Sequence, residues 1–95
     1  MTRIEKIRGA LQLTLQPQQI EVEDESHLHA GHAGAATGRG HFNVKVVAEA
    51  FTGQSLIARH RMVYAAVDAL MQTDIHALSI RALTPAESVA QSSSN

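Results

Sequence analysis

Three histidines in a glycine-rich stretch have the residue type and spacing of metal ligands. His27, His29 and His32 fall within the ten residues ESHLHAGHAG, and the chain contains no cysteine. A neutral imidazole is a good ligand for zinc, copper, nickel and iron. Ordering a glycine-rich loop around a metal costs conformational entropy, so three such side chains need something else to complete a tight site. The alternative is a polar loop whose histidines are solvated.

Two more histidines, His41 and His76, stand at the start of predicted strands. Residues 41–51 alternate apolar and polar side chains, and residues 75–83 are rich in Ile and Leu. A helix predicted over residues 55–72 joins them, and a strand–helix–strand crossover makes the two strands parallel, starting at one edge of the sheet. The long loop feeds into the first of these strands, so five of the six histidines are expected to converge there.

The predicted helix over residues 55–72 contains the sixth histidine. Its expected apolar stripe consists of Leu56, His60, Val63, Val67 and Leu70. We expect His60 to be partly buried, to orient the start of the helix and to lie far from the other histidines. No serine, cysteine or carboxylate neighbour gives it a nucleophilic or general-base arrangement, so we do not expect an enzyme.

Periodicity also predicts the first helix and the first strand. The apolar residues of the helix recur at helical spacing, at Ile4, Ile7, Leu11 and Leu15. Pro17 ends that pattern. Residues 20–25, IEVEDE, then alternate with a period of two, which predicts a strand with one buried and one acidic face, antiparallel to the next. Residues 26–40 contain four of the six glycines and predict a long, mobile loop.

The end of the chain predicts a third strand, a short helix and a tail. The more apolar face of the strand is expected to hold His76, Leu78, Ile80 and Ala82. Residues 84–87, TPAE, have the pattern of a capped helix start, and residues 91–95 are expected to be disordered. The expected fold is a single α+β domain over residues 1–90, with a three-stranded mixed sheet and helices on one face.

Composition limits the classes of partner. The chain has 95 residues, 44% of them apolar, which is enough for one compact domain. A formal net charge of -1 gives no overall attraction to nucleic acid or to an anionic membrane. No apolar run has the length of a membrane span or the form of a signal peptide, so we expect a soluble cytoplasmic protein.

Several motifs together resemble the BolA family, from about Ile4 to Glu87. They are the turn FTGQS at residues 51–55, the triplet RHR at 59–61, the strand start IHAL at 75–78 and the pair TP at 84–85. The resemblance implies a class II KH-like fold, with the order αββααβα and without the glycine clamp of KH domains. It also implies a heterodimer with a monothiol glutaredoxin around a bridging [2Fe-2S] cluster, and a monomer or weak homodimer when the chain is alone.

The resemblance also implies a set of ligands. The glutaredoxin contributes a cysteine thiolate, bound glutathione contributes another, and the BolA-like chain contributes the rest, so we expect the isolated chain to bind no cluster. The C-terminal histidine ligand of the family maps onto His76. The second ligand maps best onto His29, but this loop offers three histidines where one residue is expected. His27 and His32 therefore remain rivals.

Two other functions remain open. BolA-like proteins are also described as transcriptional regulators, and Arg59, Arg61 and Lys45 are the candidate contacts to nucleic acid. Such a set gives about two to four phosphate contacts, which implies weak and salt-sensitive DNA binding. The remaining alternative is a structural interaction module whose histidines bind nothing.

Overall fold

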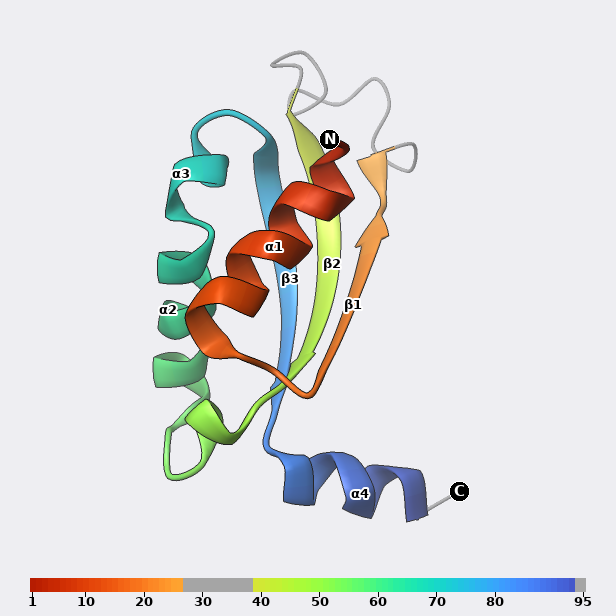
Figure 1. The fold of residues 1–95 in the computed structure, drawn as a ribbon, viewed down its shortest axis with the longest axis vertical. Helices are drawn as coiled ribbons and strands as arrows, with labels where there is room; N and C mark the ends of the chain where they lie inside the picture. Colours follow the sequence, from red (N-terminus) through yellow and green to blue (C-terminus); the bar gives the residue numbers. More distant parts are fainter. Residues whose placement is uncertain (27–38, 94–95) are drawn as a thin grey trace.

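The computed structural model describes residues 1–26 and 39–93 of the chain (Figure 1). Its elements, in order, are α1 (Arg3–Leu15), β1 (Gln19–Asp24), β2 (Gly40–Val47), η3 (Glu49–Phe51), α2 (Leu56–Ala66), α3 (Asp68–Met71), β3 (Ile75–Leu83) and α4 (Pro85–Ser93). Every element expected from the sequence is present and in the expected order. Most of the predicted loop over residues 26–40 lies outside the described part of the chain.

The three strands form one mixed sheet in the order β1-β2-β3. β1 pairs with β2 antiparallel, and β2 pairs with β3 parallel through the crossover formed by α2 and α3. This confirms the predicted α+β class and the predicted strand directions. β2 and β3 therefore begin at the same end of the sheet, the upper end in Figure 1, and α2 begins near the opposite end.

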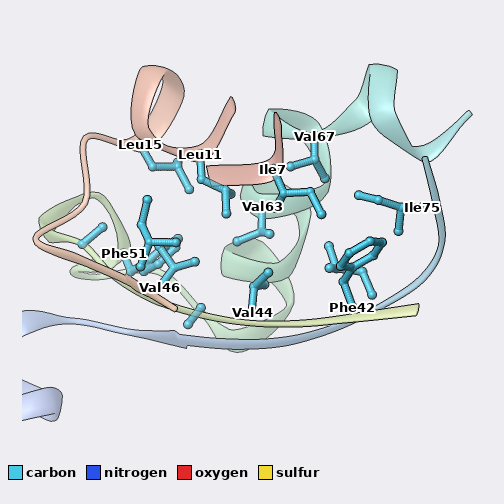
Figure 2. Close-up of a cluster of buried hydrophobic side chains, with 14 residues drawn as sticks. Ile7, Leu11, Leu15, Phe42, Val44, Val46, Phe51, Val63, Val67 and Ile75 are labelled. Carbon is cyan, nitrogen blue, oxygen red and sulfur yellow. The ribbon is translucent and has the colours of Figure 1, made fainter. Parts of the chain in front are cut away.

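The core lies between the sheet and the helices α1 and α2 (Figure 2). The inner face of β2 supplies Phe42, Val44 and Val46, which are at most 1% exposed, as the period-two pattern predicts. From the helices come Ile7, Leu11 and Val63, each 0% exposed. Burying a large apolar side chain contributes about 1.5–3 kcal/mol, so these residues fix α1 and α2 against the sheet.

The buried side of the crossover helix differs from the predicted stripe. Val63 and Val67 are buried as expected, but Leu56 is 68% exposed and His60 is only partly buried. The buried line instead starts at Arg59, one helical turn before Val63. An apolar pattern could not find it because its first member is charged. The expected helix over residues 55–72 is also divided at Val67, whose backbone is not helical, and the short turn η3 precedes it.

The last helix corrects two expectations. α4 lies beyond the end of the sheet, away from the face that α1 and α2 cover (Figure 1). Its Gln91 accepts a hydrogen bond from Arg81, whose side chain is exposed. α4 also continues to Ser93, so residues 91–93 are helical and not a disordered tail. The rest of that predicted tail, residues 94–95, lies outside the described residues.

Candidate functional site

His41 and His76 lie side by side at the common start of β2 and β3. Their ring centroids are 5.2 Å apart, and the ring planes are inclined by 47°. This confirms the prediction that the parallel crossover brings these two histidines together. The other histidine with a described position, His60, belongs to the second turn of α2, which begins near the opposite end of the sheet (Figure 1).

A bulge at the start of β3 turns His76 outward. Gly40 pairs with Ile75, but the next residue, His41, pairs with Ala77, so His76 is the extra residue of β3. Ile75 is fully buried and His76 is exposed. The prediction that His76 shares the apolar face with Leu78 was therefore wrong. The prediction assumed a strict period of two along β3, and the bulge interrupts this period.

The backbone of His41 is held by the end of β1. Its N–H donates a hydrogen bond to Oγ of Ser26 at 3.2 Å, and its carbonyl oxygen accepts one from the N–H of Glu25 at 2.8 Å. Nε2 of His41 is buried. The imidazole of His76 is therefore the more accessible of the two, and the ring of His41 lies next to it.

Gly40 stands where the strands approach each other closely. Its N–H donates a hydrogen bond to the carbonyl oxygen of Asp74 at 2.9 Å. A Cβ atom at this position would lie 2.9 Å from a ring carbon of Phe42 and closer still to Oγ of Ser26. Both neighbours are part of the packed structure, so the position requires glycine for reasons of space.

Asp74 is a charged residue at this end of the sheet that sequence reasoning missed. Its side chain is 11% exposed, and one carboxylate oxygen lies 3.3 Å from Nε of Arg3 and 3.4 Å from Nζ of Lys6. The hydroxyl of Thr73 donates to the other oxygen at 2.8 Å. That hydrogen bond is the main reason why the pKa of Asp74 is below its ordinary value; burial opposes it, and Lys6 and Arg3 add to the lowering. The feature of the sequence that could have indicated an acidic partner was the pair of cations Arg3 and Lys6 at the start of α1.

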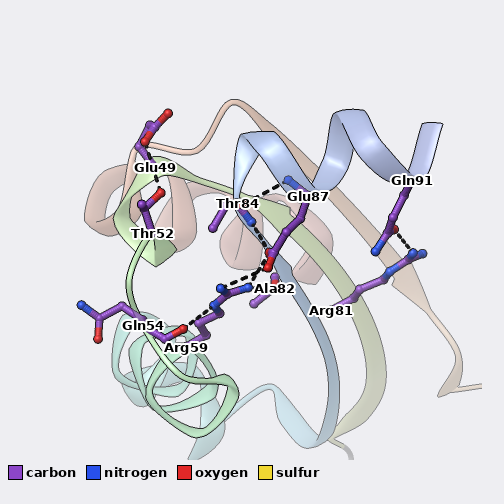
Figure 3. A network of polar contacts seen from close by, with 9 residues as sticks. All are labelled: Glu49, Thr52, Gln54, Arg59, Arg81, Ala82, Thr84, Glu87 and Gln91. Carbon is purple, nitrogen blue, oxygen red and sulfur yellow. Dashed lines mark hydrogen bonds and ion pairs between the residues drawn. The ribbon is translucent and has the colours of Figure 1, made fainter. Parts of the chain in front are cut away.

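A second polar group lies at the other end of the sheet, around Arg59 (Figure 3). The residue is 8% exposed, and its guanidinium donates to both carboxylate oxygens of Glu87, at 2.6 and 3.3 Å. It also donates to the carbonyl oxygens of Ala82 at 3.2 Å and Gln54 at 2.9 Å. The predicted helix cap is present as well, since Glu87 accepts a hydrogen bond from the N–H of Thr84. The Arg59 hydrogen bond is the main cause that lowers the pKa of Glu87 to about 2.

These contacts correct part of the expected nucleic-acid surface. Arg59 does not face solvent, because its donors are directed at Glu87 and at backbone carbonyls. Lys45 lies 3.6 Å from the carboxylate of Glu21, in a shallow depression that Glu23 also lines. Arg61 is exposed. The three predicted cations therefore do not form one basic patch.

The histidines predicted in the loop lie outside the described residues. His27, His29 and His32 belong to the segment 27–38, so the structure gives a position only for His76 among the predicted ligands. Within residues 1–26 and 39–93, no group of three or more histidine, cysteine or acidic side chains is arranged to hold a metal ion. None of the described helices is long and apolar enough to cross a membrane.

Comparison with known proteins places this geometry in a family. The sequence model for BolA-like protein matches residues 11–87. The chain is 47% identical over 87 residues to SufE-like protein 1, chloroplastic/mitochondrial, and 44% identical over 89 residues to Protein BOLA1, chloroplastic, both of Arabidopsis thaliana. It is 38% identical over 80 residues to the DNA-binding transcriptional regulator BolA of Escherichia coli.

The matches cover most of this chain but different fractions of its relatives. The matches cover 86, 90 and 84% of this chain, and 24, 56 and 73% of the relatives in the same order. The chain thus spans about a quarter of the first relative and just over half of the second. The two plant proteins carry organelle names, so a cytoplasmic location remains a prediction.

A solved structure shows the same fold. The BolA domain of SufE1 from Arabidopsis thaliana superposes with a TM-score of 0.79 at 43% identity, and the match covers 92% of this chain and 96% of that one. The sequence match over residues 11–87 and the shared fold lead to one conclusion. This chain belongs to the BolA-like protein family.

Proposed function

We propose that this protein is a BolA-like adaptor that pairs with a monothiol glutaredoxin and co-ligates a bridging [2Fe-2S] cluster. It would act in iron–sulfur cluster trafficking or in iron and redox regulation. The observation that carries the proposal is the outward-facing imidazole of His76, next to His41 at the common start of two parallel strands. We assign one ligand position to His76 and the second to His29, with His27 and His32 as rivals.

The donor set of the chain suits a shared site. The sequence has no cysteine, and the described residues contain no cluster of three metal-binding side chains. A [2Fe-2S] cluster is held by four ligands, and two imidazoles with two thiolates form the combination found in Rieske centres. This chain would supply the imidazoles, and the partner with its glutathione would supply the thiolates. The cluster, when bound, supplies one-electron redox chemistry.

The surroundings of His76 support its assignment over His41. The side chain of His76 is exposed, whereas Nε2 of His41 is buried. Ser26, the last described residue before the segment that contains His29, contacts the backbone of His41. Ser26, three positions before His29 in the sequence, therefore lies beside His41. In this arrangement His41 packs against His76 and limits the directions that its imidazole can take.

Cluster reconstitution tests the proposal directly. The protein is mixed with a monothiol glutaredoxin and glutathione, the cluster is reconstituted, and visible circular dichroism is recorded for the wild type and for His76→Ala, His29→Ala and His60→Ala. We expect a spectrum distinct from that of the glutaredoxin homodimer, lost in His76→Ala and retained in the control His60→Ala. His29→Ala decides the second ligand. A wild-type mixture that gives only the homodimer spectrum would reject the proposal.

DNA binding is the second candidate, because one relative is named a DNA-binding transcriptional regulator. Because Arg59 is buried, the remaining candidate contacts are the exposed Arg61 and the partly buried Lys45. With so few cations, we expect weak binding and a shallow dependence on salt. A titration of duplex DNA between 50 and 200 mM salt, with Arg61→Gln as the variant, separates this function from the cluster role. A steep salt dependence would favour DNA binding by an assembly of several copies.

A further inference from the structure

The start of α1 carries two cations in an electrostatically unfavourable place. Arg3 and Lys6 lie in the first turns of α1, where the partial positive charge of the helix N-terminus disfavours cations. Thr2 caps this end, since its hydroxyl accepts a hydrogen bond from the N–H of Glu5 at 3.1 Å. Both cations instead lie within ion-pair distance of Asp74, which compensates for their position on the helix.

Asp74 connects four elements through separate contacts. Its carboxylate contacts α1, and its carbonyl oxygen accepts the hydrogen bond of Gly40 at the start of β2. Its own N–H donates to the carbonyl oxygen of Leu70 in α3 at 2.8 Å. Asp74 is also the residue directly before β3. Contacts with α1, β2 and α3 therefore fix the position of Asp74, from which the chain enters β3.

The bulge that exposes His76 begins one residue after this point. Ile75 is fully buried and pairs with Gly40, and His76 follows as the extra residue. A bulge redirects a side chain only while the residues on both sides of it keep their pairing. On one side Gly40 pairs with Ile75, and this pairing includes the hydrogen bond from the N–H of Gly40 to the carbonyl oxygen of Asp74. Movement of Asp74 would thus change the direction of the His76 imidazole.

We propose that Asp74 is a positioning residue for His76. Its contacts with Arg3 and Lys6 tie the start of β3 to α1 and hold the bulge that places the His76 ring against His41. The geometric part of this proposal concerns the isolated chain. Its consequence for a cluster rests on the function proposed above.

The isolated full-length chain gives the first test. Asp74→Asn removes the charge and keeps the size of the side chain, and Glu87→Gln is the matched control, a carboxylate at the opposite end of the sheet. Two NMR signals are followed: the NOEs between the ring protons of His41 and His76, and amide hydrogen exchange of Gly40 relative to Val46. We expect Asp74→Asn to weaken the NOEs and to raise the exchange ratio about fivefold to tenfold. Glu87→Gln should change neither signal.

A second variant guards against loss of folding. Arg3→Gln combined with Lys6→Gln removes the same ion pairs from side chains that are 40 and 41% exposed, so no buried group is lost. It should reproduce the direction of both changes. Unchanged NOEs and an unchanged exchange ratio in this double variant would overturn the proposal, and so would equal changes in Glu87→Gln, which would indicate a general loss of stability.

Cluster reconstitution then separates this inference from the proposed function. With glutaredoxin and glutathione, Asp74→Asn should give a weaker heterocomplex signal than Glu87→Gln under the same conditions. Equal signals would overturn the role of Asp74 in presenting His76. If the wild type forms no shared cluster, the proposed function fails, while the NMR comparison still decides whether Asp74 positions the ring.

Discussion

The guanidinium of Arg59 in α2 lies 2.6 Å from the carboxylate of Glu87 in α4, and the two side chains join helices at opposite sides of the end of β3 (Figure 3). Arg59 begins the buried line of α2, and Glu87 also caps the first turn of α4. One carboxylate therefore serves both a local and a long-range contact. Together with the hydrogen bond from Arg81 to Gln91, this ion pair helps to hold α4 in its position.

Replacing Arg59 should destabilise the fold. Arg59→Ala leaves the carbonyl oxygen of Ala82 without its guanidinium donor and removes the partner of Glu87. We expect the free energy of unfolding to fall by about 2–3 kcal/mol, less than for a fully buried pair because Glu87 is half exposed. For a domain of this size, that corresponds to a fall in Tm of about 10–20 °C. Arg61→Ala, an exposed neighbour, is the control, and thermal unfolding measures both. Equal Tm values for the two variants would contradict the assigned role.

Glu87 should make the stability depend on pH in the acid range. Its pKa is about 2 in the folded protein, below the ordinary value of 4.5, so the ionised form favours folding. The stabilisation is complete above pH 4.5 and is lost as the pH falls toward 2. Glu87→Gln should therefore be less stable than the wild type at neutral pH, and the difference should shrink in acid. Urea unfolding at a series of pH values measures it, with Glu23→Gln as control. A difference that stays constant down to pH 2 would rule out this linkage.

Gly40 should not tolerate a side chain. Gly40→Ala places a Cβ atom against the ring of Phe42 and the hydroxyl of Ser26, and we expect a loss of about 1–3 kcal/mol in stability. Gly9→Ala is the matched control: outside its chain neighbours and the backbone of its own helix, no atom lies within 4 Å of the added Cβ. Alanine also favours the helix, so this variant should stabilise by about 0.5–1 kcal/mol. Ser26→Gly combined with Gly40→Ala should recover part of the loss. Denaturant unfolding tests all three, and similar effects at Gly9 and Gly40 would refute the steric explanation.

Periodicity and chain direction were enough to predict the sheet and the meeting of two histidines. The alternation of Phe42, Val44 and Val46 gave the inner face, and the crossover rule placed His41 beside His76. These features depend on local pattern and on the parallel strand direction that a strand–helix–strand crossover imposes. They are the parts of a fold that a sequence states most directly.

The features that sequence reasoning missed depend on contacts between distant residues. The bulge at His76 arises from a register change between β2 and β3, and no residue type in the sequence predicts it. The burial of Arg59 depends on Glu87, 28 positions later, and Asp74 binds cations 71 and 68 positions away. A charged residue reads as exposed until its partner is known, which is why Arg59 was expected on the surface.

The proposed shared cluster should be lost in mild acid. Imidazole binds a metal only when it is neutral, and an ordinary histidine has a pKa of about 6.5, so acid competes with any imidazole ligand of a cluster. We expect the visible circular dichroism signal of the heterocomplex to fall below about pH 6. The glutaredoxin homodimer serves as the control. Its cluster would be held entirely by thiolates of glutaredoxin and glutathione, so it should keep its signal to a lower pH. A heterocomplex spectrum unchanged down to pH 5 would mean that imidazole does not ligate the cluster.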